Sequence, residues 1–400
     1  MVTSIQYRHI PKCSLVLYYD NTRAEGGNLM RTDKQIAQSL LESAGITING
    51  LNDYDIQVHN ENLYSRVLRQ GAMGLGEAYM DGWWDVPKLD QFFEKILGVD
   101  LDEKIKGDWG ILLKASLGII LNAGRKSKAF QVGQTHYDIG NDLYRAMLDK
   151  RLVYTCGYWK DAKDLDQSQE AKLDLVCKKI GLKKGQTVLD IGSGWGSFIK
   201  FAAEKYGAKT TGVTVSIEQK KLADELNKNL PATTILEDYR DINQKFDHVV
   251  SLGMFEHVGY KNYRTYMKVA HKALNDNGLF LLHTIGGNNS THSTDPWLGK
   301  YIFPNSMIPS IQQIGKSIEG LFVMEDWHNF GPDYDKTLMQ WYKNFEKNWD
   351  KLSVNYDERF HRMWRYYLLQ SAAGFRTRKL QLWQIVLSKN GVNGVYKTIR

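Results

Sequence analysis

Cysteine is scarce in this sequence of 400 residues, and its pattern argues against two kinds of stabilised domain. The three cysteines, Cys13, Cys156 and Cys177, are odd in number and include no CxxC pair. A disulfide framework and a structural zinc site are therefore not expected, and no metal is predicted. This usage of cysteine indicates a reducing compartment.

Long apolar runs are also missing. No run reaches the roughly 18–20 residues that a membrane-spanning helix needs. Near the N-terminus only CSLVLYY is apolar, and Asp20 follows at once, which is a poor pattern for a signal peptide. The sequence therefore predicts a cytoplasmic protein.

A strong net charge is absent too. The value is +7, so bulk electrostatics give no reason to expect nucleic acid as a partner. The charge is uneven, however, because the last thirty residues carry six basic side chains and no acidic one. Such a stretch is either a solvated tail or a face for phosphate head groups, and we expect peripheral association with the inner face of the membrane. The six residues are Arg376, Arg378, Lys379, Lys389, Lys397 and Arg400.

Periodicity divides the chain into a leader and two domains. Residues 1–33 show no clear period and are expected to be a loosely ordered leader. Residues 34–125 are predicted to form a small, mainly helical N-terminal domain. Its first helix places Ile36 and Leu40 on one face and can end at Gly45. Residues 126–400 are expected to form the second, larger domain, which would carry the catalytic site.

The segment 109–128, WGILLKASLGIILNAGRKSK, carries an apolar stripe. Lys114 interrupts the stripe, and Arg125, Lys126 and Lys128 close it. The segment is either a core helix or a membrane-facing helix whose basic side chains meet lipid phosphates.

From about residue 165 strands and helices alternate, which predicts an α/β domain with a doubly wound, mostly parallel sheet. Asp166 with Gln169 is predicted to cap the first helix, which places Cys177 in the core. Two helices are expected beyond residue 335, the first carrying Leu338 to Leu352 and the second Phe360 to Leu368. Strands are expected in QTVLDI, AKTTGVTV, TTILEDYRD, FDHVVSLG, ALNDNGLFLLHTIGG and LQLWQIVLSK.

The first of these strands ends in a glycine-rich turn, Asp190-Ile-Gly-Ser-Gly-Trp-Gly. In sheets of this type a ligand binds beyond the carboxyl ends of the strands. The spacing GxGxG differs from the dinucleotide pattern GxGxxG, and Asp190 would repel a pyrophosphate but can hold an ammonium group. Gly192 and Gly194 therefore predict a site for S-adenosylmethionine and disfavour an NAD-dependent oxidoreductase.

Two later strand ends extend this predicted cofactor site. Asp238 follows the third strand, where its carboxylate can accept from an adenine amino group. The second strand lacks the acidic end that many such enzymes use for the ribose, so Thr214 and Gln219 would serve instead.

Many words of the sequence, from about residue 34 to the C-terminus, resemble those of the cyclopropane-fatty-acyl-phospholipid synthases, relatives of the mycolic acid cyclopropane synthases. They include GLGEAYMDGWW, HYDIGNDLY, YTCGYW, LDIGSGWG, GMFEHVG, LLHTIG, KYIFPN and EDWHNFGPDYDKTLMQW. The resemblance implies a class I methyltransferase (Rossmann-like) fold. It also implies transfer of a methylene carbon from S-adenosylmethionine to cis double bonds of unsaturated phospholipid acyl chains.

The same resemblance implies site residues. The family's pocket for a bicarbonate ion, acting as the base, falls on Cys156, Glu256, His283, Ile285 and Tyr334. Its cofactor contacts fall on Tyr154, Thr155, Asp190, Gly192, Gly194, Thr214, Gln219 and Asp238. Some relatives have cysteines where this chain has Ser193 and Ser371, which counts against a need for either sulfur.

The chemistry defines what such a pocket needs. Methyl transfer to an alkene leaves a carbocation, so the site must exclude water and stabilise positive charge. Aromatic faces do this, and Tyr137, Tyr158 and Trp159 are candidates, with core packing as the alternative role. Cys156 is expected to contribute its backbone amide rather than a thiolate, which the cofactor would methylate. His136 is either a capping or core residue or part of the site.

Other functions stay open at this point. The enzyme could stop at a methyl-branched or hydroxylated product, or the chain could be a catalytically silent regulator that binds lipid or S-adenosylmethionine. Families with a small N-terminal domain of this kind can pair through it, so a homodimer is a hypothesis.

Overall fold

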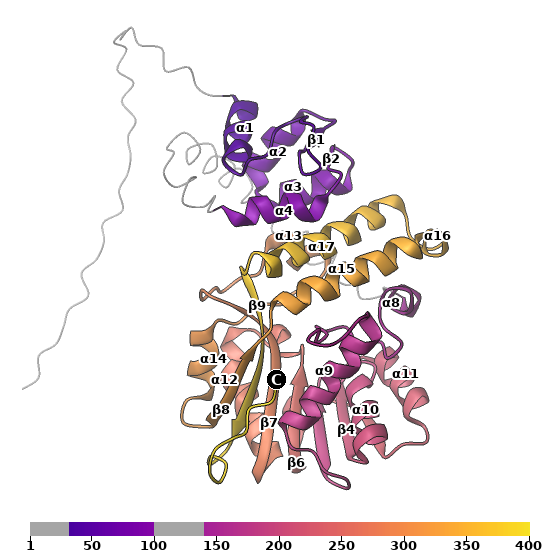
Figure 1. Cartoon of the computed structure of the whole chain (residues 1–400), viewed down its shortest axis with the longest axis vertical. Coiled ribbons are helices and arrows are strands. Elements are labelled where there is room, and N and C mark those ends of the chain that lie inside the picture. The colour runs from indigo at the N-terminus through magenta and orange to yellow at the C-terminus, as the bar shows by residue number, and fades with distance from the viewer. Residues whose placement is uncertain (1–31, 100–139) are drawn as a thin grey trace, which may run out of the picture.

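The computed structural model describes residues 32–99 and 140–400 (Figure 1). Several predictions lie outside these ranges: the leader at residues 1–33 except its last two positions, the segment 109–128 and the boundary near 125. Cys13, His136 and Tyr137 lie outside them as well. Within the described ranges, none of the helices combines the length and apolar character needed to cross a membrane. The same ranges contain no group of three or more His, Cys, Asp or Glu side chains arranged for a metal.

A seven-stranded sheet in the order β5-β4-β3-β6-β7-β9-β8 forms the centre of the larger part. The first five strands in this order are parallel, and β9 is antiparallel to both of its neighbours. The predicted doubly wound, mostly parallel sheet is confirmed. The strands are β3 (Thr187–Ile191), β4 (Lys209–Thr214), β5 (Ala232–Leu236), β6 (Phe246–Leu252), β7 (Leu274–Gly287), β8 (Val323–Asn329) and β9 (Leu380–Ser388).

Helices cover both faces of this sheet, and alternate strand residues serve the two faces. Val188 of β3 packs with α9 (Leu165–Lys179) and α10 (Ser197–Tyr206), and α11 (Ile217–Asn227) follows beside them. Leu189 packs on the other face with α12 (Tyr263–Ala273) and α14 (Ile311–Ile318). Because side chains alternate along a strand, Asp190 points to the same face as Val188, towards α9.

The N-terminal helices lie above the sheet and share one apolar core with later helices (Figure 1). Trp84 and Phe92 of the N-terminal part belong to the same cluster as Trp341 and Trp364. Besides single residues of α9, α11 and β9, the contributing elements include α1 (Asp33–Ser43), β1 (Gln57–Val58), α2 (Asn62–Gln70), α3 (Ala72–Met80), β2 (Trp84–Asp85), α4 (Leu89–Gly98), α8 (Asn141–Met147), α13 (Pro296–Tyr301), α15 (Pro332–Lys347), α16 (Trp349–Leu352) and α17 (Glu358–Arg376).

The predicted basic face at the C-terminus is only partly formed. The Arg376 guanidinium bonds Asp90, Glu94 and Asp335, at 2.9 to 3.0 Å. Arg400 forms two hydrogen bonds of 2.6 Å with Asp326. These two guanidiniums are therefore engaged inside the molecule, and the stretch as a whole is not a free tail.

Two local predictions were wrong. The cap of α9 is Asp164, whose carboxylate accepts from the backbone N–H of Gln167, while Asp166 accepts from the N–H of Lys150. The first helix beyond residue 335 ends at Lys347, because the Asn348 side chain turns back to the carbonyls of Ala146 and Asn344. The predicted end of the first N-terminal helix is confirmed, since Gly45 has φ +69° just after α1.

Gly76 allows α3 to lie directly against Trp297, so we expect Gly76→Ala to destabilise the protein. A Cβ there would lie 2.4 Å from Cδ1 of the fully buried indole. Overpacking costs about 1–3 kcal/mol, against a helix-propensity gain of about 1 kcal/mol. Thermal denaturation should show a lower Tm. Gly315→Ala in α14 is the control, because no described atom lies within 4 Å of its Cβ position, and its Tm should not fall. An unchanged Tm for Gly76→Ala would contradict the packing argument.

Candidate active site

The glycine loop joins the carboxyl end of β3 to the start of α10. Gly192 has φ +86°, a conformation that strongly favours glycine, and a Cβ there would lie 2.8 Å from the Met254 Cβ. The backbone N–H groups of Gly192 and Ser193 both donate to the carbonyl of Val213 at 3.0 Å. The loop is thus fixed against β4 and places Gly194 at the sheet edge where ligands bind in this architecture.

Asp190 lies just before this loop, with an exposed fraction of 1%. Its Oδ1 is buried and has no hydrogen-bond partner among the described residues. Burial raises the pKa of this carboxyl to about 7, and the positive charge of Lys172 acts against that rise. An unpartnered buried carboxylate oxygen fits a cationic ligand group, such as an ammonium.

The ends of the next two strands carry the other predicted cofactor residues. Thr214 donates to Oε1 of Gln219 at 2.8 Å, so these side chains pair with each other beyond β4. Asp238 follows β5, and both of its carboxylate oxygens accept from Arg240, at 2.7 to 2.9 Å. These hydrogen bonds hold the pKa of Asp238 below its usual range. The structure therefore orders these side chains along one edge of the sheet with partners of their own.

The segment Tyr154–Trp159 crosses this edge between α9 and α15. The Tyr154 hydroxyl lies 2.8 Å from that of Tyr367. The Thr155 hydroxyl accepts from Lys172 Nζ at 2.7 Å, and its methyl lies against Gly253 at the end of β6. Trp159 donates its indole N–H to Thr337 at 2.9 Å, which favours a packing role for this ring.

Cys156, inside this segment, is fully buried, and its thiol donates to the carbonyl of Gly157 at 3.1 Å. Burial raises the pKa of the thiol well above its ordinary value, so the sulfur is a neutral S–H. The backbone N–H of Cys156 has no partner among the described residues. The amide of Cys156, rather than its neutral sulfur, is therefore the group left open to a ligand.

Glu256 and Ile285 are brought into contact by the strand order. Glu256 lies in the short 3-10 helix after β6, and Oε1 accepts from the Ile285 N–H of β7 at 2.7 Å. Its Oε2 is buried without a partner among the described residues. Burial raises the pKa of Glu256 to about 7. Glu256 is therefore poised to hold or release a proton near neutral pH.

His283 and Tyr334 complete the predicted pocket. His283 lies two residues before Ile285 on the same face of β7, with Nδ1 3.3 Å from the Gln384 amide and Nε2 unpartnered among the described residues. Burial lowers the pKa of His283 well below its usual value, so the ring is neutral. Tyr334 is buried at the start of α15, close enough to Cys156 and Glu256 to interact with them electrostatically.

Sequence patterns did not single out Lys172 or Thr337 and gave Gln169 only a role in a helix cap, although all three are buried and bond the Tyr154–Trp159 segment. A usable signal existed for Lys172. It falls on the apolar face of α9, in line with Gln169 and Val176, where a charged side chain needs an explanation.

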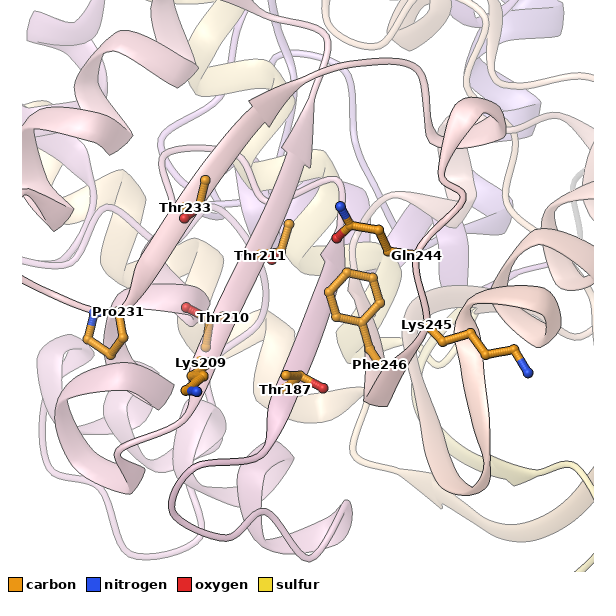
Figure 2. A pocket seen from close by; sticks show the side chains of 9 residues that line it. All are labelled: Thr187, Lys209, Thr210, Thr211, Pro231, Thr233, Gln244, Lys245 and Phe246. Atoms are coloured by element: carbon orange, nitrogen blue, oxygen red, sulfur yellow. The ribbon is translucent and has the colours of Figure 1, made fainter.

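A separate hollow of about 360 Å³ lies at the opposite edge of the sheet, where β3, β4 and β6 begin (Figure 2). Thr187, Lys209 and Phe246 are the first residues of these strands and line it. It contains none of the predicted site residues. Since ligands of such sheets bind at the carboxyl ends, we assign it no part in the site.

The raised pKa of Glu256 predicts a pH-dependent stability. Between about pH 4.3, the value of a free Glu, and pH 7, the folded protein keeps a proton that the unfolded chain releases. Stability therefore falls as pH rises through this window, by on the order of 3 kcal/mol, and stays lower above it. Glu256→Gln should abolish this contribution, so it should exceed wild type in stability at pH 8 but not at pH 5. Denaturant unfolding at both values, with exposed Glu225→Gln as control, measures the difference. An equal difference at both pH values would contradict the assignment.

Comparisons with known proteins agree with this architecture. A family model described as mycolic acid cyclopropane synthetase matches residues 124–385. The cyclopropane-fatty-acyl-phospholipid synthase of Escherichia coli is 49% identical over 361 residues, which is 90% of this chain and 94% of that protein. A probable fatty acid methyltransferase of Pseudomonas putida is 36% identical over 65% of this chain and 69% of its own length.

Solved structures show the same relationship. The cyclopropane synthase MmaA2 from Mycobacterium tuberculosis superposes with a TM-score of 0.61 at 27% identity, over 66% of this chain and 100% of that one. Mycolic acid cyclopropane synthase CmaA1, complexed with SAH and CTAB, gives a TM-score of 0.60 at 30% identity, over 65% of this chain and 98% of that one.

Proposed function

Because this chain belongs to the mycolic acid cyclopropane synthetase family, we propose that it forms cyclopropane rings in lipids. The methylene carbon comes from S-adenosylmethionine, and the acceptors are cis double bonds of unsaturated phospholipid acyl chains. The observation that carries this proposal is the similarity to the Escherichia coli cyclopropane-fatty-acyl-phospholipid synthase along nearly the whole chain.

The residues beyond β3, β4 and β5 fit S-adenosylmethionine. The unpartnered Oδ1 of Asp190 would take its ammonium group, and Gly192 and Gly194 let the backbone approach it closely. Tyr154 and Thr155 would line the methionyl part. Thr214, Gln219 and Asp238 would face the nucleoside, after releasing the partners they hold in this structure.

The pocket around Glu256 and His283 fits a small anion such as bicarbonate. Glu256 Oε2 and His283 Nε2 are both buried without partners among the described residues. We assign Glu256 and neutral His283 to hold and accept protons, and the Tyr334 hydroxyl and the Cys156 N–H to donate hydrogen bonds. The Ile285 N–H donates to Glu256, so in this arrangement it orients the carboxyl group. When bound, S-adenosylmethionine supplies an electrophilic methyl group and bicarbonate supplies a base.

Two aromatic side chains, the buried Phe330 and the partly buried Tyr158, lie beside this pocket. The Tyr158 ring lies 5.3 Å from that of Phe330, which in turn lies 6.0 Å from His283. Their faces can stabilise the carbocation that forms on the acyl chain, at about 0.5–2 kcal/mol each. The neutral Cys156 thiol offers no competing nucleophile.

We also propose that residues 34–125 form a domain that faces lipid at the inner membrane surface or pairs two copies of the chain. Flotation with anionic vesicles tests the first role, and light scattering at working concentration tests the second. A protein that neither floats with vesicles nor exceeds the mass of a monomer would overturn this assignment.

The test of the main proposal uses purified protein, liposomes of cis-unsaturated phospholipid and S-adenosylmethionine with a labelled methyl group. Mass spectrometry should show acyl chains heavier by one CH₂, labelled, and unreactive as alkenes. A labelled chain that is branched and still unsaturated, or hydroxylated, would replace ring formation by methyl transfer alone. Binding of S-adenosylmethionine without any labelled lipid would indicate a silent regulator.

A further inference from the structure

Lys172 of α9 is fully buried and, in the described part of the chain, has no carboxylate partner of its own. Its ammonium donates to the Thr155 hydroxyl at 2.7 Å, and none of the described carboxylates forms an ion pair with it. Burying a charge in this way is costly unless it serves a compensating purpose. Burial lowers the pKa of Lys172 to about 8, so the ammonium form prevails at neutral pH.

The backbone around Thr155 does not need Lys172 to hold its shape. The Thr155 carbonyl accepts from Gln169 Nε2 at 2.7 Å, and the Gly157 N–H donates to Thr337 at 3.1 Å. Upstream, the Asp149 carboxylate accepts from the Val153 N–H at 2.8 Å.

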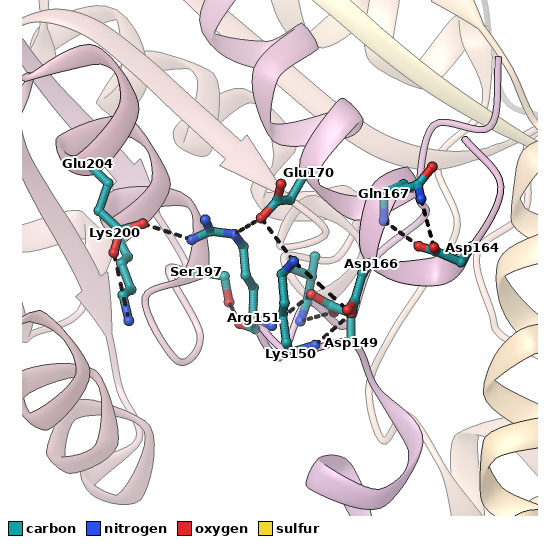
Figure 3. A network of polar contacts seen from close by, with 11 residues as sticks. Asp149, Lys150, Arg151, Asp164, Asp166, Gln167, Glu170, Ser197, Lys200 and Glu204 are labelled. Carbon is teal, nitrogen blue, oxygen red and sulfur yellow. Dashed lines mark hydrogen bonds and ion pairs between the residues drawn. The ribbon is translucent and has the colours of Figure 1, made fainter. Parts of the chain in front are cut away.

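The turn before this segment is fixed as well (Figure 3). Arg151 bridges Glu170 of α9 and Glu204 of α10, at 2.9 and 3.0 Å. Ser197 donates to the Arg151 carbonyl at 2.7 Å. The backbone is held by these bonds, and the hydrogen bond that Lys172 adds goes to the hydroxyl of Thr155.

The hydrogen bond from Lys172 fixes the direction of the Thr155 hydroxyl group. An ammonium only donates, so it occupies an acceptor position on the Thr155 oxygen. The hydroxyl hydrogen must then point elsewhere, which makes Thr155 a donor. Because the Thr155 methyl rests against Gly253, and neighbouring Met254 packs on Gly192, this donor lies beside the glycine loop.

The charge of Lys172 also has an opposite charge nearby, on Asp190. Asp190 and Lys172 lie on the same side of the sheet and interact electrostatically without direct contact. The other groups that interact with Lys172 are Asp149, Cys156 and His283. One buried acid and one buried base match a zwitterion, which is the form of the methionyl end of S-adenosylmethionine.

We propose that Lys172 is a positioning residue for the methionyl carboxylate of the cofactor, acting through Thr155. The ammonium fixes the Thr155 hydroxyl as a donor to that carboxylate and supplies its countercharge, while Asp190 receives the ammonium group of the ligand. This inference rests on the proposed function.

The test compares two ligands by titration calorimetry. S-adenosylhomocysteine has the amino-acid group, whereas methylthioadenosine lacks it. Lys172→Met should weaken S-adenosylhomocysteine by about tenfold or more and leave methylthioadenosine within about twofold. Thr155→Val should show the same selective loss, and Thr155→Ser should restore binding. Lys178→Met, on the exposed side of α9, is the matched control and should bind both ligands as wild type does.

The outcomes separate this inference from the proposed function. Equal weakening of both ligands, or no weakening, in Lys172→Met would overturn the role of Lys172. If that variant does not fold, Thr155→Val decides in the same way, because it removes the hydroxyl and leaves the lysine. Wild-type protein that binds neither ligand would overturn both proposals. Wild-type protein that binds them but forms no cyclopropane would overturn the proposed reaction, and the selectivity of the variants would still decide the inference.

Discussion

Glu256→Gln is expected to lose cyclopropane formation by a factor of about 10²–10⁴, the range of a lost general acid or base. The substitution keeps the size of the side chain and its contact with the Ile285 N–H, but it removes the group that exchanges a proton. The buried Oε2, which has no partner among the described residues, is the atom we assign to that exchange. Labelled methyl incorporated into liposome acyl chains measures the loss.

Measuring ligand binding separates a catalytic effect of Glu256→Gln from a general loss of structure. S-adenosylhomocysteine should bind Glu256→Gln about as tightly as wild type, since Glu256 is not among the residues assigned to the cofactor, most of which lie beyond β3 to β5. Exposed Glu225→Gln should keep full activity. Activity within threefold of wild type in Glu256→Gln would remove Glu256 from the catalytic proposal.

Asp190→Asn is expected to weaken S-adenosylhomocysteine binding by about 100-fold, because it removes the buried charge that would meet the ligand's ammonium group. The backbone should stay in place, since the Gly192 and Ser193 amides hold the loop to Val213. Methylthioadenosine, which carries no ammonium, should bind nearly unchanged. Calorimetric titration of both ligands gives the comparison.

The matched control is Asp224→Asn, an exposed carboxylate of α11 paired with Lys220. Its affinity for both ligands should equal that of wild type. If Asp190→Asn binds S-adenosylhomocysteine normally, the ammonium must lie elsewhere, and the zwitterion argument for Lys172 loses its acidic half.

The parallel sheet and the glycine loop could be predicted because their signals are local. Val188, Leu189 and Ile191 make β3 an apolar run that only Asp190 interrupts, and the loop glycines have positive φ, so neighbouring residues suffice. Strand β8 was missed because it pairs at the sheet edge and is only partly buried, which weakens its alternation.

Local sequence patterns cannot predict a helix cap where two neighbouring residues have the right spacing. Asp164 with Gln167, and Asp166 with Gln169, both have cap spacing. A distant contact decides between them, because Gln169 is taken by the Thr155 carbonyl. The pocket has the same property: that Glu256 meets Ile285 follows from strand pairing, whereas the resemblance supplied only their names.

The core shared by the first and last helices has a consequence for synthesis on the ribosome. Phe93 of α4 packs edge-on against Tyr366 of α17, with ring centres 4.9 Å apart. At about 5–20 residues per second, the partner of Phe93 emerges only after on the order of tens of seconds. Until then the apolar side chains by which α3 and α4 pack on α17 lack that partner, so the nascent chain carries uncovered apolar surface for most of its translation. A ribosome that stalls before α17 would release a product whose earliest helices are the part exposed to proteases.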